Sequence, residues 1–264
     1  MFMTLTDPRP EYAALTATGR VREHNEDALL CCPPLNLWAV ADGMGGHQRG
    51  EVASALALKT LRSLTQRGED LVGAIQGAHA AILAEAEQDD GSRGMGTTLV
   101  AVRFSGADFQ LAWVGDSRAY RVGATDIEQL SRDHSWVQAM VDAGQMTPEQ
   151  ASSHPRRNIV TQCLGQADQE LQVDQLQGRL GSGELLLLCS DGLTGELSDA
   201  QIQQICTSAG TLEAVVSELV EAANREGGKD NISCIVLGLS GPAAAPAEER
   251  PRGFFEKLLK PAKS

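Results

Sequence analysis

The sequence predicts an α+β fold, in which amphipathic helices accompany antiparallel strands. Short apolar runs such as Leu37–Ala41 and Leu185–Cys189 are too brief for helices and rich enough in bulky residues for buried strands. Longer stretches, among them residues 50–64 and 211–225, carry apolar residues at helical spacing. On either side of Gly115 two strand-like runs are joined by a tight turn, and this pattern predicts an antiparallel hairpin.

Composition and charge restrict the class of protein. The chain has 264 residues, enough for one large core or two small domains, and a formal net charge of −13. That charge argues against nucleic-acid binding, which requires a basic surface for the phosphates. The longest purely apolar run, Leu185–Cys189, is far shorter than a membrane span, and Met1–Arg22 lacks the pattern of a signal peptide. The six cysteines form no C-x-x-C pair, which predicts free thiols and a cytoplasmic location.

A polar excursion interrupts the strand pattern in the middle of the chain. Its first part is weakly helical, and Thr147 and Gln150 have the spacing of a capping box at the start of a second short helix. A mixed-charge stretch of this kind between strands is typical of a mobile flap, which we place at about residues 136–164. Farther along, Ser198 and Gln201 predict another capping box.

Carboxylates recur where the predicted strands begin or end. Asp42, Asp116 and Asp191 each stand at the end of an apolar run with a glycine beside them, and Asp230 stands at the start of another run. Taken singly, each has a plainer interpretation, since the segment Asp42–Gly46 can be only a turn between two elements. Four carboxylates at one buried edge, however, would repel one another and raise each other's pKa unless cations lay among them.

The chemistry of these side chains indicates hard divalent cations. No set of Cys and His residues competes for a metal, and carboxylate and carbonyl oxygens are the ligands that Mg²⁺ and Mn²⁺ prefer. Gly43 has no Cβ, so its carbonyl can approach an ion closely. Two such ions about 3.5–4 Å apart can hold a phosphate and activate a water for in-line attack, with Arg22 on the phosphoryl oxygens. The adjacent acids Glu26 and Asp27 either join this site or belong to a solvated loop.

The chain changes character after residue 240. Residues 241–250 are rich in Pro and Ala, and residues 250–264 carry five Lys/Arg and one Glu, a net charge of +4. We therefore predict one domain over residues 1–240, followed by a disordered linker and a basic amphipathic tail over residues 241–264. The tail either docks on a partner or a membrane surface or is a frayed terminus.

Eight segments of the chain resemble, in the same order, motifs of the metal-dependent protein phosphatases of type 2C, a serine/threonine-specific family with compact bacterial members. The segments are Gly19–Asp27, Val40–Gly46, Gly96–Thr98, Gly115–Tyr120, Asp133–Ser135, Asn158–Gly165, Ser190–Gly195 and Gly228–Ser233. Each alone is weak, but eight in order make a strong signal. The resemblance implies a four-layer α-β-β-α sandwich: two antiparallel sheets packed face to face, with helices on both outer faces and metals at one end.

The resemblance also implies a metal-binding role for each strand-end acid. Asp42 would bridge two ions, either Mn²⁺ or Mg²⁺, and the Gly43 carbonyl would bind one of them. Asp191 and Asp230 would complete the coordination of the second ion. Asp116 would belong to a weaker third metal of the kind found in bacterial members.

Three further residues take implied roles from the family. Glu26 and Asp27 would hold waters coordinated to the ions, and Arg22 would bind the substrate phosphate. The residue at the position of the general acid departs from the family pattern, because many eukaryotic members have histidine where this chain has Met44. His47, three residues on, matches the bacterial variant of the motif, and either it or a metal-bound water would be the proton donor.

The implied reaction is hydrolysis of phosphoserine and phosphothreonine esters by in-line attack of a hydroxide that bridges two divalent metals. Its catalytic residues would be Arg22, Asp42, Asp191 and Asp230. The sequence contains no Cys-x₅-Arg loop, which argues against a cysteine-based phosphatase. The expected partners are phosphoproteins and a cognate bacterial serine/threonine kinase, with the protein itself a monomer. Two alternatives stay open: a catalytically weak regulatory or binding member of the same fold, and a hydrolase of another phosphoester such as a nucleotide.

Overall fold

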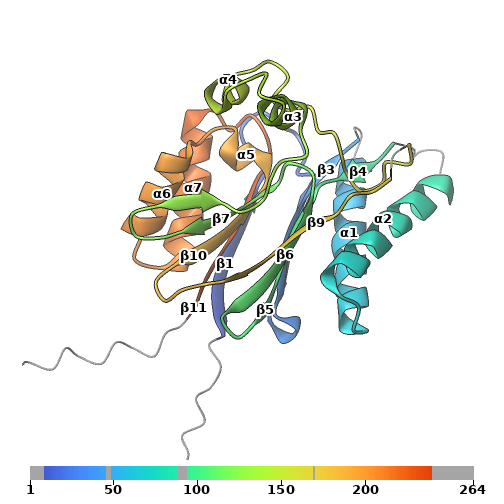
Figure 1. Cartoon of the computed structure of the whole chain (residues 1–264), viewed down its shortest axis with the longest axis horizontal. Helices are drawn as coiled ribbons and strands as arrows, with labels where there is room; N and C mark the ends of the chain where they lie inside the picture. The colour runs from blue at the N-terminus through green and yellow to red at the C-terminus, as the bar shows by residue number, and fades with distance from the viewer. Residues whose placement is uncertain (1–8, 46–48, 89–93, 169, 240–264) are drawn as a thin grey trace, which may run out of the picture.

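The computed structural model describes residues 9–45, 49–88, 94–168 and 170–239 (Figure 1). His47 and the predicted linker and tail over residues 241–264 lie outside the described residues. The strands are β1 Pro10–Ala17, β2 Asp27–Cys32, β3 Leu37–Met44, β4 Gly96–Thr97, β5 Leu99–Ser105, β6 Asp108–Val114, β7 Arg118–Val122, β8 Ile127–Gln129, β9 Asp174–Arg179, β10 Leu185–Cys189 and β11 Ile232–Leu239. The helices are α1 Arg49–Gln66, α2 Leu71–Gln88, α3 Trp136–Asp142, α4 Pro148–Ser152, α5 Asp191–Thr194, α6 Asp199–Ser208 and α7 Leu212–Glu226, with a 3₁₀ turn at Pro33–Leu35.

The strands form two antiparallel sheets packed face to face. One sheet has the strand order β1-β11-β10-β7-β8, and the other has the order β2-β3-β5-β6-β9 with β4 paired to β3. Helices α1 and α2 cover the outer face of the second sheet, and α6 and α7 cover the outer face of the first (Figure 1). The predicted four-layer α-β-β-α sandwich is confirmed.

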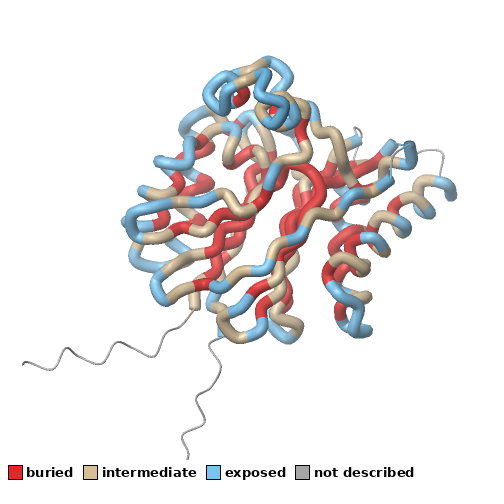
Figure 2. The backbone as a smooth tube through the Cα atoms, viewed as in Figure 1, coloured by how far each residue is buried: buried red, intermediate tan, exposed pale blue. Residues whose placement is uncertain are grey.

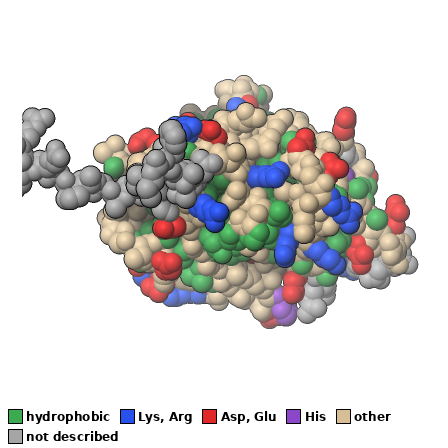
Figure 3. Space-filling view, turned by 90° about the horizontal axis from the view of Figure 1, so that it is seen from below, with side chains coloured by type: hydrophobic (Ala, Val, Ile, Leu, Met, Phe, Trp, Pro, Cys, Tyr) green, Lys and Arg blue, Asp and Glu red, His purple; other side chains and the backbone are tan. Residues whose placement is uncertain are grey.

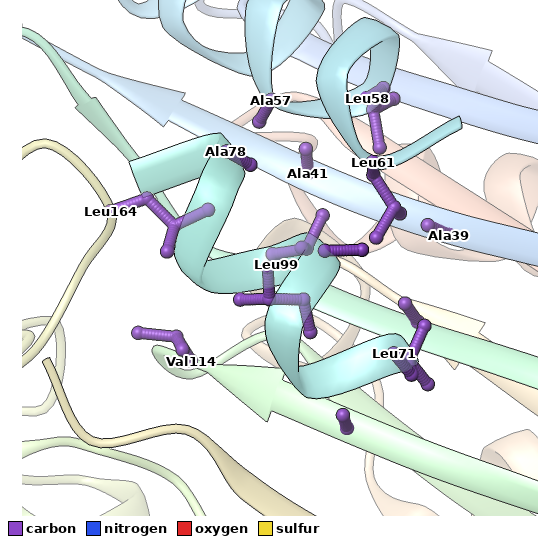
Figure 4. Packing of buried hydrophobic residues seen from close by; sticks show 14 of the residues in the cluster. Ala39, Ala41, Ala57, Leu58, Leu61, Leu71, Ala78, Leu99, Val114 and Leu164 are labelled. Carbon is purple, nitrogen blue, oxygen red and sulfur yellow. The ribbon is translucent and has the colours of Figure 1, made fainter. Parts of the chain in front are cut away.

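The hydrophobic core has three layers because the central strands are buried on both faces (Figure 2). In β3, Trp38 and Val40 point between the two sheets, whereas Ala39 and Ala41 point toward α1 and α2. This alternation follows from the two-residue period of a strand. Figure 4 shows the layer under the helices, where Leu61 of α1 lies among side chains of the sheet. Burial on both faces explains why these strands are continuous apolar runs in the sequence.

The predicted hairpin around Gly115 is wrong. β6 pairs with β5 and β9, whereas β7 pairs with β10 and β8, so the two strands belong to different sheets. The turn therefore crosses from one sheet to the other instead of joining neighbours within a sheet. Gly115 has φ +104°, and a Cβ there would lie 2.6 Å from the side chain of Thr98. Only glycine fits this crossing point, since a side chain would meet both a strained backbone and a steric clash.

Local signals at helix starts are confirmed more closely than strand boundaries. Thr147 with Gln150, and Ser198 with Gln201, form the two predicted capping boxes at the starts of α4 and α6. By contrast, β3 continues through Asp42 to Met44, beyond the predicted end of the apolar run, because its last residues pair with β4. Backbone pairing extends a strand past the point where side-chain hydrophobicity stops.

Candidate metal centre

The predicted acids gather at one end of the sandwich, the end that carries α3, α4 and α5 (Figure 1). Asp27 and Asp42 face each other across the pairing of β2 and β3. Asp191 begins α5 directly after β10, Asp230 precedes β11, and Asp116 lies in the turn between β6 and β7. Figure 3 shows the opposite end of the molecule, where Lys and Arg side chains and Asp and Glu side chains are both scattered among apolar and uncharged surface. The topology thus brings together acids that are far apart in the sequence.

Asp27 lies at the junction of the two sheets and has one carboxylate oxygen without a protein partner. The residue is 8% exposed, and its Oδ2 accepts a hydrogen bond of 2.8 Å from Ser190 Oγ on the other sheet. Its Oδ1 is buried and accepts no hydrogen bond. Burial raises the pKa of Asp27 to about 7, and the nearby charges of Asp191 and Asp230 add to this. An orphaned, buried carboxylate oxygen is a position that a cation or its coordinated water would satisfy.

Asp42 and Asp191 form the electrostatic centre of the site. Burial raises the pKa of Asp42 well above its ordinary value, and the charges of neighbouring acids raise it further. Burial also raises the pKa of Asp191, with the charge of Asp230 adding to the effect. A hydrogen bond between the Asp191 and Asp42 side chains offsets part of this penalty. The folded protein therefore holds two carboxyl groups in contact, an arrangement that a divalent cation would stabilise.

Asp116 belongs to the same group of acids and lies in the turn between β6 and β7. It is 6% exposed, and burial together with the charges of Asp191 and Asp133 raises its pKa well above the ordinary value. Arg118, two residues on, makes a bidentate ion pair with Asp133, from Nε to Oδ1 at 3.0 Å and from Nη2 to Oδ2 at 2.7 Å, and donates to Tyr120 Oη at 2.9 Å. This ion pair joins β7 to the segment that precedes α3.

Gly43 lies where β3 passes against the start of α1. Its N–H donates to the backbone oxygen of Glu26 at 3.2 Å, and the Glu26 Oε1 accepts from the N–H of Gly50 at 3.2 Å. A Cβ at Gly43 would lie 2.2 Å from the backbone oxygen of Gly50. Glycine is thus required at position 43 by the close approach of two backbones. The first turn of a helix also suits the carboxylate of Glu26, because the helix dipole favours negative charge there.

Arg22 lies at the rim of the site and pairs with one of the acids. Its Nη2 donates to Asp230 Oδ2 at 2.7 Å, and its side chain is 53% exposed. This hydrogen bond raises the pKa of Arg22, and the charges of Asp230, Asp191 and Asp42 contribute. The guanidinium is therefore placed at the mouth of the acidic cluster, within reach of solvent.

These side chains are candidate ligands rather than a closed cage. Within the described ranges, no three Asp, Glu, His or Cys side chains are positioned to hold one ion as they stand. Asp230 is engaged by Arg22 and Asp27 by Ser190, and both partners would have to share these carboxylates with a metal. The donor set is nevertheless made of carboxylate and carbonyl oxygens, which fits Mg²⁺ or Mn²⁺.

Three supporting residues were not among the predicted site residues. Ser190 donates to Asp27, Thr98 accepts from the backbone N–H of Asp42 at 3.2 Å, and the Asn231 side chain contacts the loop that carries Arg22. Each lies within a segment already recognised by its motif, next to or near a glycine or an acid. These motif segments indicate that the three residues lie near the site, but they do not indicate which acid each residue contacts.

Among the solved structures to which this chain is similar are bacterial serine/threonine phosphatases. The phosphatase PstP/Ppp of Mycobacterium tuberculosis aligns with a TM-score of 0.82 at 36% identity, covering 88% of this chain and 100% of that one. Stp1 of Staphylococcus aureus aligns with a TM-score of 0.81 at 35% identity, covering 88% and 95%. A structure of the PstP catalytic domain in complex with two manganese ions aligns with a TM-score of 0.79 at 34% identity, covering 88% and 99%. The fold thus has the architecture of these phosphatases.

Sequence comparison leads to the same class. PhpP of Streptococcus pneumoniae is 36% identical over 241 residues, covering 87% of this chain and 98% of that protein. PstP of M. tuberculosis is 38% identical over 231 residues, covering 85% of this chain but only 44% of that longer protein. The family model for protein phosphatase 2C matches residues 18–236. The chain belongs to the protein phosphatase 2C family.

Proposed function

We propose that this protein is a metal-dependent serine/threonine phosphatase that hydrolyses phosphoserine and phosphothreonine esters. The observation that carries the proposal is the cluster of Asp27, Asp42, Asp116 and Asp191, whose pKa values are raised by burial at one end of the sandwich. Relatives that this chain matches over most of its length are named serine/threonine phosphatases or protein phosphatases.

The proposed ligands are the oxygen donors of the cluster. They are Asp42, the Gly43 carbonyl, Asp191 and Asp230 for two Mn²⁺ or Mg²⁺ ions, Glu26 and Asp27 through water, and Asp116 for a weaker third ion. When bound, such ions activate the attacking water and neutralise the developing charge on the phosphate. The two manganese ions in the structure of the related PstP catalytic domain support this assignment.

Arg22 supplies the substrate-binding group from the protein itself. Its guanidinium is half exposed at the mouth of the cluster, where its planar set of donors can hold two phosphoryl oxygens. Binding of the phosphate there would require Arg22 to exchange its contact with Asp230 for one with the substrate. Met44 has no proton to donate to the leaving group, so a general acid must come from another side chain or from water.

We further propose one catalytic domain over residues 1–240, with residues 136–164 as a flap beside the site. The continuity of the three hydrophobic layers, which draw on residues from Ala13 to Leu237, supports this. The proposed partners are phosphoproteins and a cognate kinase that modifies them, with the phosphatase a monomer in the cytoplasm. All six cysteines are free. Among the described helices, none is long and apolar enough to cross a membrane.

The 264-residue chain should release phosphate from a phosphothreonine peptide and from p-nitrophenyl phosphate only when Mn²⁺ or Mg²⁺ is added. The measurement is phosphate release with each metal and with EDTA, on protein whose fold is checked by circular dichroism. A nucleotide offered in parallel tests the alternative substrate class. Folded protein that hydrolyses neither phosphoester with either metal would refute the enzymatic function.

Metal should stabilise the protein more at pH 8 than at pH 5.5. Because burial raises the pKa values of Asp27, Asp42, Asp116 and Asp191, the folded state binds more protons than the unfolded state. In EDTA, stability should therefore fall as the pH rises from about 4, the ordinary pKa of Asp, through about 7, the pKa of Asp27. A cation favours the ionised carboxylates and reverses this loss.

Thermal unfolding with and without Mn²⁺ at the two pH values measures this effect. At Mn²⁺ about 100-fold above its Kd, the stabilisation is about 2.7 kcal/mol, or roughly 5–10 °C in Tm. A Tm shift that is equal at both pH values, or larger at pH 5.5, would show that the buried acids are not the metal ligands.

A further inference from the structure

The loop that carries Arg22 has little support of its own. Residues 18–26 contain no helix or strand, and Val21 in this loop is 65% exposed. The loop lies on the segment that precedes β11: Arg20 N donates to the Gly228 oxygen at 2.7 Å. A Cβ on Gly19 would lie 2.2 Å from the Asp230 backbone oxygen, so loop and segment are in direct contact. The position of Arg22 therefore depends on the contacts between this segment and the loop.

Besides the Arg22–Asp230 contact, the Asn231 side chain makes three hydrogen bonds between the segment and the loop. Its Nδ2 donates to the backbone oxygens of Thr18 at 3.0 Å and of His24 at 2.9 Å, and its Oδ1 accepts from Glu26 N at 2.9 Å. The residue is 6% exposed. One buried amide thus binds the start, the later part and the end of the loop at the same time.

The chemistry of these three contacts requires a carboxamide. Two backbone oxygens need donors and one backbone N–H needs an acceptor, and the Asn side chain presents both within a single planar group. Aspartate has the same shape but would place oxygen against two carbonyl oxygens, and a hydrophobic residue would leave all three backbone groups unpaired.

We propose that Asn231 is the positioning residue for Arg22, an inference that rests on the proposed phosphatase function. The backbone N–H of Asn231 also donates to Asp230 Oδ1 at 2.8 Å, while Arg22 reaches Asp230 Oδ2 at 2.7 Å. The same residue therefore fixes the loop beneath Arg22 and the acid that Arg22 contacts. Asn231 sets the separation between the phosphate-binding guanidinium and the carboxylates of the site without itself touching the substrate.

The test is a double-mutant cycle on KM for a phosphothreonine peptide at saturating Mn²⁺. Arg22→Ala and Asn231→Ala should each raise KM by about tenfold, the loss of one charged hydrogen bond to the phosphate. The double variant should show about the same tenfold increase, because Arg22 no longer contributes once its loop is displaced. A roughly hundredfold increase, the product of independent effects, or an unchanged KM in Asn231→Ala, would overturn the proposal.

Hydrogen exchange of the loop amides provides a readout that does not depend on activity. Exchange across residues 18–26 should accelerate in Asn231→Ala and stay unchanged in Val216→Ala, which removes core packing from α7 and no hydrogen bond of the loop. If no variant or wild-type protein hydrolyses the peptide, the phosphatase function fails while the exchange result still decides the role of Asn231. Unchanged exchange in the loop would overturn that role.

The double-mutant cycle also requires that the Asn231 variant folds. If Asn231→Ala does not fold, Asn231→Asp is put through the same cycle, since it keeps the shape and removes the two donors. If neither variant folds, Asn231 supports the core rather than the loop, and the proposal is overturned.

Discussion

Asp191→Asn is expected to reduce kcat by a factor on the order of 10²–10³ or more, because the substitution removes an anionic oxygen from the centre of the acidic cluster. Asparagine has nearly the same shape, so the start of α5 should be preserved. In EDTA the variant should be as stable as wild type or more stable, since burial and the charge of Asp230 penalise the Asp191 carboxylate. Loss of activity with retained stability is the expected combination.

Asp108→Asn is the matched control for this substitution. Asp108 begins β6, and its side chain is 64% exposed and paired with Arg179. The same change of charge there should leave both kcat and Tm nearly unchanged, because an exposed ion pair contributes little. Substantial turnover in Asp191→Asn would mean that the metal assignment is wrong, and loss of its fold would mean that the carboxylate has a structural role.

Gly43→Ala is expected to lower both stability and activity. The added methyl group would lie 2.2 Å from the backbone oxygen of Gly50 and 2.5 Å from that of Glu26. Relief of these clashes would displace the start of α1 or of β2 from β3. Overpacking of this kind costs about 1–3 kcal/mol, which corresponds to a fall in Tm of roughly 2–12 °C. Displacement of the Gly43 carbonyl should also weaken activation by Mn²⁺.

Gly210→Ala separates the effect of contact from the effect of losing a glycine. Gly210 lies between α6 and α7, where an added Cβ meets no atom within 4 Å. Thermal unfolding and the Mn²⁺ dependence of kcat should both resemble wild type in this variant. If Gly43→Ala behaves like Gly210→Ala, then position 43 tolerates a side chain and the close approach of the two backbones is not required.

The sequence predicts well those parts of the fold that depend on a short-range pattern, such as an apolar run in a strand buried on both faces or a polar cap at a helix start. The strands β3 and β10 are buried on both faces, so their apolar runs stand out from the flanking sequence. Thr147 and Ser198 cap helices through a contact only three residues away. In contrast, β9 has the polar sequence DQLQGR and lies at a sheet edge, where pairing with β6 rather than side-chain burial defines the strand.

The site shows the same division. Asp42, Asp116 and Asp191 could be selected because an acid beside a glycine at a strand end is unusual, and the order of the motifs placed them together. The contacts of Asn231 with Thr18 and His24 join positions more than 200 residues apart in the chain. Such contacts depend on how the two sheets meet, which no local pattern encodes. The crossing at Gly115 was mistaken for a hairpin for the same reason.

The proposed function requires that the acidic cluster binds the divalent metals on which hydrolysis depends. Calorimetric titration of Mn²⁺ into the wild-type 264-residue chain, into Asp191→Asn and into the control Asp108→Asn measures this binding. We expect two tightly bound ions per chain in the wild type and in the control, the number in the related PstP structure, and fewer in Asp191→Asn. A wild-type protein that binds no Mn²⁺, or an Asp191→Asn variant that binds it with unchanged stoichiometry and affinity, would contradict the account.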